Sequence, residues 1–192
     1  MPRRPEKRIR RVSVLGSGKV RGKDPAYLQA VKLGMALAQK GLSVYHGGYR
    51  GVMEAVAKGC RLAGGRNVGV TIRPKSKPGF DNHRQSQALI WVNPWADVEI
   101  KMSDWQSRLF KLVEIGEAYI FLDGATGTLA ELFVVLEMTN RGLLKKPIII
   151  LGKNLGFLLR QLKKDPHFEL PDSLHFVTSI SRTIKLLIGD RV

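Results

Sequence analysis

One short segment of the chain carries the residue types that could bind and cleave a phosphorylated ligand. It reads Asp123-Gly124-Ala125-Thr126-Gly127-Thr128-Leu129-Ala130-Glu131. Glycines let the backbone approach an anion closely, and the N–H groups that open a helix can hold a phosphate together with threonine hydroxyls. We therefore predict that the phosphate-binding residues are Gly124, Thr126, Gly127 and Thr128. Glycine and threonine are also ordinary turn and N-cap residues, so the segment alone leaves a structural role open.

Two other glycine-rich turns are expected beside this segment. Gly16-Ser17-Gly18 follows an alternating apolar run, and residues 47–51 follow the apolar run of residues 42–45. The carboxyl ends of parallel strands meet at one edge of a sheet, so these turns should line the same site. The predicted nucleotide-binding residues are Gly16, Ser17, Gly47, Gly48 and Gly51. Arg21 stands where a dinucleotide fingerprint needs its third glycine, so we expect no NAD.

These turns belong to a chain in which strand patterns alternate with helix patterns. Strands are predicted at residues 12–14, 42–45, 67–72, 88–92, 118–122 and 147–151. Helices are predicted at residues 25–38, 52–62, 97–116, 126–141, 156–164 and 179–188. This order indicates an α/β fold with a doubly wound, mostly parallel, Rossmann-like sheet and helices on both faces. We expect a single domain over residues 12–192, preceded by a basic arm at residues 1–11 that could be disordered.

Some side chains and loops have more than one expected role. Residues 73–84 contain two prolines and a glycine, which predict a loop that could cover a ligand. Phe133 is expected to face inward from its helix. Tyr49 and Arg50 could contact a ligand from a loop tip, although solvent exposure is the favoured expectation. The tryptophans could stack on a base, although core or subunit contacts are commoner for this residue. They are Trp91, Trp95 and Trp105.

The composition restricts the class of protein. The chain has 32 Lys and Arg against 16 Asp and Glu, and the net charge of +16 would attract phosphorylated ligands, nucleic acid or anionic surfaces. Its apolar runs fall far short of the roughly 18 to 20 residues that cross a bilayer, and the first residues lack a signal-peptide pattern. We therefore expect a cytoplasmic protein without a membrane segment. Cys60 is the single cysteine, and the histidines show no ligand spacing, so no metal site is expected.

The spacing of the motifs resembles that of the Lonely Guy proteins, which are cytokinin-activating nucleoside 5′-monophosphate phosphoribohydrolases. The family signature Pro-Gly-Gly-x-Gly-Thr-x-x-Glu is matched at Gly124, Gly127, Thr128 and Glu131. Residues 47–53 resemble the family block Gly-Gly-x-x-Gly-Leu-Met, and Arg108 stands fifteen residues before the signature, where the family has an arginine. Four family residues are replaced, by His46, Leu109, Asp123 and Ala125. The resemblance runs from about residue 12 to residue 151.

The resemblance implies hydrolysis of an N-glycosidic bond, which releases a free base and ribose 5-phosphate through an oxocarbenium-like transition state. The implied catalytic residues are Glu131, which would act on water or stabilise the sugar cation, and Arg108, which would hold the phosphate or the base. Without the resemblance, Glu131 could merely complement a helix dipole and Arg108 could be a surface cation. An AMP-like substrate, a homodimer and no cofactor are also implied.

Two alternatives remain. A carrier without turnover, similar to the molybdenum-cofactor carriers that share this fold and a related glycine-rich signature, is favoured by the changes at Asp123 and Ala125. Nucleic-acid binding is favoured by the net charge, although the sequence contains no recognition motif for it. Relatives of the family are also labelled lysine decarboxylases, but no lysine here has the partners that a pyridoxal cofactor requires.

Overall fold

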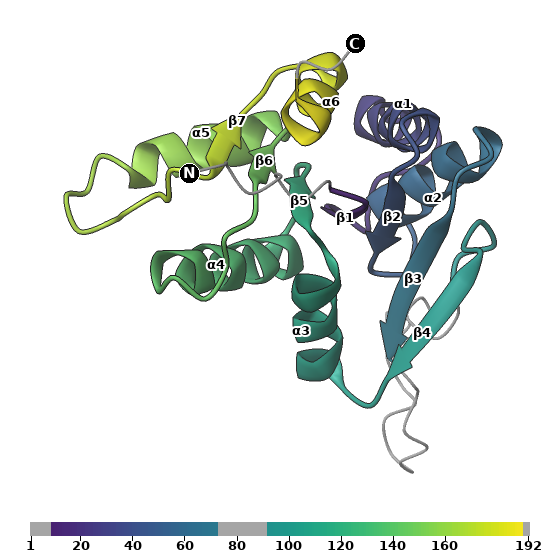
Figure 1. Cartoon of the computed structure of the whole chain (residues 1–192), viewed down its shortest axis with the longest axis horizontal. Coiled ribbons are helices and arrows are strands. Elements are labelled where there is room, and N and C mark those ends of the chain that lie inside the picture. The colour runs from purple at the N-terminus through teal and green to yellow at the C-terminus, as the bar shows by residue number, and fades with distance from the viewer. Residues whose placement is uncertain (1–8, 73–91, 190–192) are drawn as a thin grey trace, which may run out of the picture.

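The computed structural model describes residues 9–72 and 92–189. Within these residues the strands form one sheet in which every pairing is parallel, in the order β4-β3-β2-β1-β5-β6-β7 (Figure 1). The strands are β1 Arg11–Leu15, β2 Ser43–His46, β3 Asn67–Ile72, β4 Val98–Met102, β5 Ala118–Phe121, β6 Ile148–Ile150 and β7 Leu174–Phe176. The helices are α1 Pro25–Gln39, α2 Val52–Leu62, α3 Trp105–Ile115, α4 Thr126–Asn140, α5 Lys153–Leu162 and α6 Ile180–Ile188. The predicted α/β class is confirmed.

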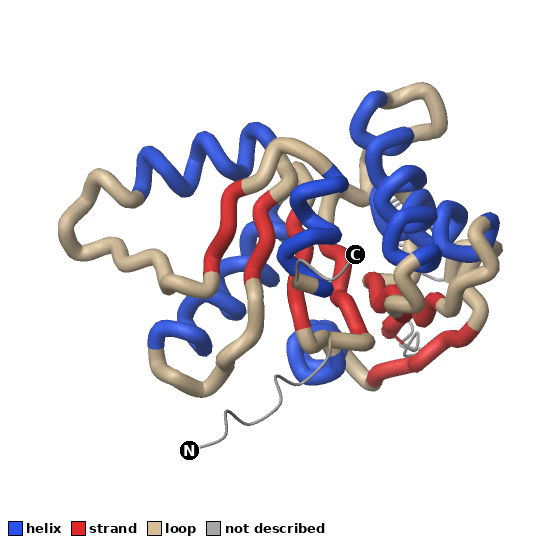
Figure 2. The backbone as a smooth tube through the Cα atoms, turned by 45° about the horizontal axis from the view of Figure 1, so that its top comes forward, coloured by secondary structure: helices blue, strands red, loops and turns tan. Residues whose placement is uncertain are grey.

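Helices cover both faces of this sheet, as Figure 2 shows. On one face α1, α2 and α6 bury apolar side chains against strand residues such as Val14 and Ile120. On the other face α3, α4 and α5 pack against Tyr119 and Phe121, among others. Both strand faces are apolar, as expected for a parallel sheet that is covered on both sides. The doubly wound arrangement is therefore also confirmed.

The strand order changes direction at β1, which has β2 on one side and β5 on the other. Leu15 pairs with Phe121, and the Leu122 N–H donates to the Leu15 carbonyl at 2.9 Å. The turns that follow β1 and β5 therefore leave the sheet side by side. Ligands of open α/β sheets bind in the crevice at such a switch point.

The structure differs from the prediction in three elements, β4, α5 and β7. Residues 98–102 form β4 rather than the start of a helix, because Val98, Ile100 and Met102 alternate with polar residues and pair with β3. Asp104 then begins α3 with a capping box. Helix α5 begins at residue 153, three residues earlier than predicted, and the short edge strand β7 was not predicted.

Two of the side-chain expectations are wrong. Phe133 is 37% exposed, because α4 turns it away from the sheet, and Tyr49 is 5% exposed, because its ring packs under Arg108. Arg50 is exposed, as expected, and Trp105 is also exposed. The predicted loop at residues 73–84, residues 88–91 of a predicted strand and residues 1–8 of the predicted arm lie outside the described residues.

Candidate functional site

The predicted glycine-rich turns meet at Ser17. The Ser17 N–H donates to the Asp123 carbonyl at 3.0 Å, and the Ser17 carbonyl accepts the Val52 N–H at 2.8 Å. Ser17 thereby joins the turn after β1 to the turn after β5 and to the start of α2. Gly51 has φ +73°, and a Cβ there would lie 2.2 Å from the Ser17 oxygen, so only glycine fits. The structure thus brings the predicted phosphate-binding and nucleotide-binding segments to one place.

Arg108 occupies the centre of this place. Its Nε donates to the Val70 carbonyl at 2.9 Å, and its Nη2 donates to the Gly47 carbonyl at 2.9 Å. The guanidinium also lies over the Tyr49 ring, 5.3 Å from its centroid. Arg108 is only 6% exposed, which overturns the alternative of a surface cation. Helix α3 turns this residue toward the sheet, because it shares the helix face of Leu109 and Leu112.

The predicted catalytic pair is brought together. Arg108 Nη1 lies 3.5 Å from Glu131 Oε1, and their side chains are 8% and 13% exposed. Burial raises the pKa of the Glu131 carboxyl above its ordinary value, and the Arg108 charge opposes part of this rise. A carboxylate whose pKa is raised in this way can accept a proton from water more readily than a solvated one.

The start of α4 is open to an anion. Ala125 is the N-cap residue, and its side chain forms no cap hydrogen bond with this helix. Thr126 and Gly127 are exposed, whereas Thr128 is 5% exposed. A Cβ at Gly124 would lie 2.1 Å from the Thr128 hydroxyl oxygen, so glycine is required there for packing. The first-turn amides of α4 and the positive end of its dipole are therefore available to a phosphate.

Asp123 does not direct its charge at this anion site. Its carboxylate accepts the backbone N–H of Leu155 at 2.8 Å and that of Asn154 at 3.2 Å. It therefore caps the start of α5, the helix that follows the neighbouring strand. A Cβ at Gly152 would lie 2.5 Å from the Asp123 side chain, so a glycine there makes room for the carboxylate. The contacts of Asp123 with α5 explain the replacement of the family proline and leave the start of α4 open.

Two further side chains lie beside Arg108: Tyr49, which the sequence had left open as a ligand contact, and Met53, which had not been predicted as part of the site. Tyr49 packs under the guanidinium and its hydroxyl accepts the Ile72 N–H at 3.0 Å. The Met53 sulfur lies 4.0 Å from Arg108 Nη2. Both residues belong to the block at residues 47–53. The resemblance of that block to the family is the sequence feature that could have indicated them as part of the site.

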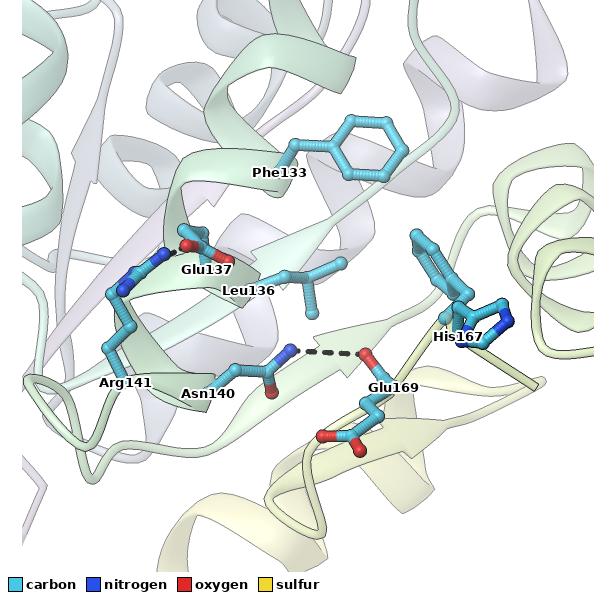
Figure 3. Close-up of a pocket in the computed structure, with 8 residues that line it drawn as sticks. Phe133, Leu136, Glu137, Asn140, Arg141, His167 and Glu169 are labelled. Atoms are coloured by element: carbon cyan, nitrogen blue, oxygen red, sulfur yellow. Dashed lines mark hydrogen bonds and ion pairs between the residues drawn. The ribbon is translucent and has the colours of Figure 1, made fainter. Parts of the chain in front are cut away.

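A separate cavity of about 520 Å³ lies at the other end of α4 (Figure 3). The side chains of Phe133 and Glu137 line it from α4, and His167 and Glu169 line it from the segment after α5. None of the predicted site residues lines this cavity. Over residues 9–72 and 92–189, no group of three or more His, Cys, Asp or Glu side chains could hold a metal ion. No helix within these residues is long and apolar enough to span a membrane.

Several known proteins are similar to this chain in sequence. A protein of Archaeoglobus fulgidus is 30% identical over 76% of this chain and 86% of its own length. The cytokinin riboside 5′-monophosphate phosphoribohydrolase of Rhodococcoides fascians is 30% identical over 71% of this chain. The rice (Oryza sativa subsp. japonica) cytokinin riboside 5′-monophosphate phosphoribohydrolase is 31% identical over 76% of this chain. The matches span only 65% and 56% of the length of these two enzymes.

The chain is also similar to solved structures and matches a family model. The molybdenum cofactor binding protein from Rippkaea orientalis has a TM-score of 0.68 and 24% identity, over 94% of this chain and 96% of that one. This likeness shows the shared fold alone. Residues 9–178 match the SLOG cluster4 family. The predicted kinship with the Lonely Guy proteins is confirmed, and the chain belongs to the SLOG cluster4 family.

Proposed function

We propose that this protein hydrolyses the N-glycosidic bond of a nucleoside 5′-monophosphate and releases a free base and ribose 5-phosphate. The observation that carries this proposal is the buried pair of Glu131 and Arg108 beside the uncapped start of α4. The relatives that are named phosphoribohydrolases support the same reaction.

In this proposal the 5′-phosphate binds the first-turn amides of α4. Glu131 follows Gly127 by four residues, which corresponds to about 6 Å along the helix axis, a separation that a ribose can span. The glycine-rich turns would form the facing wall, with Gly16 and Ser17 on one side and Gly47 on the other. The required glycines leave backbone, rather than side chains, at the surface of this wall.

Glu131 would serve as the general base that activates water, or would stabilise the positive charge that develops on the sugar. Burial raises the pKa of the Glu131 carboxyl, which makes it a stronger base, and the Arg108 charge opposes part of this rise. Such a base contributes about 10²- to 10⁴-fold to a rate. Arg108 would also hold the carboxylate in place, since its own position is fixed by two carbonyls.

We further propose that the protein acts in the cytoplasm as a homodimer with an AMP-like substrate. Helices α3 and α4 carry exposed aromatic side chains at Trp105, Phe110 and Phe133. In this proposal these side chains are available for contact with the partner subunit. The net charge of +16 would draw an anionic nucleotide toward the protein.

Incubation with AMP, followed by chromatography for free adenine and ribose 5-phosphate, tests the reaction. We expect turnover by the wild-type protein and its near-complete loss in Glu131→Gln, which keeps the size of the side chain. Bound but intact AMP would replace the hydrolase proposal with the carrier alternative. The contacts of Asp123 with α5 weaken the part of the carrier argument that rested on Asp123, while the change at Ala125 still favours a carrier.

A further inference from the structure

A fully buried histidine, His46, lies directly beneath the turn that contacts Arg108. Its Nδ1 accepts the Gly48 N–H at 3.1 Å, and its Nε2 lies 3.0 Å from Asn67 Oδ1. Because Nδ1 is an acceptor, the neutral ring carries its proton on Nε2 and donates it to Asn67. Both ring nitrogens are therefore used, and the tautomer is fixed by its partners.

The partner of His46 is itself held in one orientation. The Asn67 side-chain nitrogen donates to Asp97 Oδ2 at 2.8 Å and to the Trp95 carbonyl at 3.0 Å. Its amide oxygen must therefore face His46. The chain of hydrogen bonds runs from Asp97 through Asn67 and His46 to the backbone of Gly48. A network in which each member is bonded rigidifies the groups at its end.

A glycine in the middle of β3 makes room for this ring. A Cβ at Gly69 would lie 3.3 Å from His46 Cε1 and 3.0 Å from Gly48 Cα. A glycine inside a strand weakens it and often marks a place where another group approaches closely. Here the approaching groups are the imidazole of His46 and the turn that this ring supports.

The turn is fixed from its other side as well. The Gly48 carbonyl accepts the Asn93 N–H at 2.8 Å, and Gly48 has φ +81°. The preceding carbonyl, that of Gly47, accepts Arg108 Nη2. The direction of the Gly47 carbonyl, and with it the position of the guanidinium, depends on how Gly48 is held.

Burial keeps His46 neutral. Burial and the Arg108 charge lower its pKa to about 4, while Asn67 and Asp97 oppose this shift. The ring therefore remains an acceptor at neutral pH and adds no positive charge beside Arg108.

We propose that His46 is a positioning residue: by accepting the Gly48 N–H it aims the Gly47 carbonyl at Arg108, which in turn is held toward Glu131. Its effect on turnover depends on the proposed function, whereas its effect on Arg108 does not.

Two variants of His46 separate positioning from simple packing. His46→Asn places Oδ1 near the site of Nδ1 and keeps the bond to Gly48, whereas His46→Leu fills similar space without an acceptor. We expect His46→Leu to lower kcat/KM for AMP by about 10- to 100-fold, because a small displacement of a catalytic group has such effects. His46→Asn should retain most of the turnover.

The Arg108 Nε–H resonance in a ¹H–¹⁵N spectrum provides a readout that does not depend on turnover. In the wild type we expect this proton to exchange slowly with solvent, because it is buried and donates to the Val70 carbonyl. The exchange should remain slow in His46→Asn and become fast in His46→Leu. Should His46→Leu fail to fold, His46→Ala, which also removes the acceptor of the Gly48 N–H, should have the same effect.

Slow solvent exchange of the Arg108 Nε–H in His46→Leu, or in His46→Ala as its substitute, would overturn the proposal. The exchange rate of the Arg108 Nε–H could change in the variants as expected while the protein shows no turnover. This result would support His46 as a positioning residue and would refute the hydrolase function. The two failures are therefore distinguishable.

Discussion

Gly47→Ala is the substitution whose effect can be worked out most fully from the structure. A Cβ at residue 47 would lie 1.9 Å from Arg108 Nη2 and 2.6 Å from the Met53 sulfur. Non-bonded heavy atoms settle near 3.5 to 4 Å, so the guanidinium would have to move by roughly 1 Å or more. This movement would break its bond to the Gly47 carbonyl and shift it relative to Glu131.

A misplacement of about 1 Å in a catalytic arrangement costs about 10²-fold in rate. We therefore expect kcat/KM for AMP to fall by about two orders of magnitude in Gly47→Ala. Overpacking should also destabilise the fold by about 1 to 3 kcal/mol. The melting temperature should fall by about 2 to 4 °C per kcal/mol, as expected for a domain of this size. Steady-state kinetics and thermal unfolding measure the two effects.

Gly22→Ala is a matched control, because a Cβ at residue 22 meets nothing within 4 Å and its φ is not positive. It should keep both the turnover and the melting temperature of the wild type. Equal kinetics for Gly47→Ala and Gly22→Ala would refute the idea that Arg108 must occupy its observed position.

Three other predictions follow from the electrostatics. The acid limb of kcat/KM against pH should lie above 4.5, the ordinary pKa of glutamate, because burial raises the pKa of Glu131; a limb at or below 4.5 would contradict this. Asp123→Ala removes the cap of α5 and should lower the free energy of unfolding by about 1 kcal/mol, measured by denaturant titration, whereas an unchanged value would mean that the cap contributes nothing. Neutral His46 stabilises the folded protein fully above pH 6.5, and this contribution is lost as the pH falls toward 4. The free energy of unfolding should therefore fall by up to about 3 kcal/mol over this range. His46→Asn should not show this fall when the two proteins are compared by denaturant titration at each pH.

The arrangement of the glycine-rich turns could be predicted from the sequence, because parallel topology brings strand ends to one edge. The turn at Ser17 and the segment that begins at Asp123 meet for this reason. The contact between Arg108 and Glu131 could not be predicted from residue types, since nothing local distinguishes a buried arginine from an exposed one on an amphipathic helix. The family resemblance was the only signal that paired them.

The errors came from long-range contacts and from short elements. Asp123 caps a helix whose first residues lie some thirty positions later, so local patterns could not give the carboxylate a partner. Residues 98–102 alternate over one short stretch that runs directly into the α3 pattern, and their pairing with β3 decides their conformation. His46 was noted only as a departure from the family, because its partners at residues 48 and 67 are set by the fold.

A crystal structure of Glu131→Gln with AMP bound would test the proposed site. The proposed function predicts that the 5′-phosphate accepts hydrogen bonds from the N–H groups of residues 126–128 and that the anomeric carbon faces the side chain at position 131. A nucleotide bound elsewhere, for example in the cavity beside Phe133, with the start of α4 empty, would contradict it.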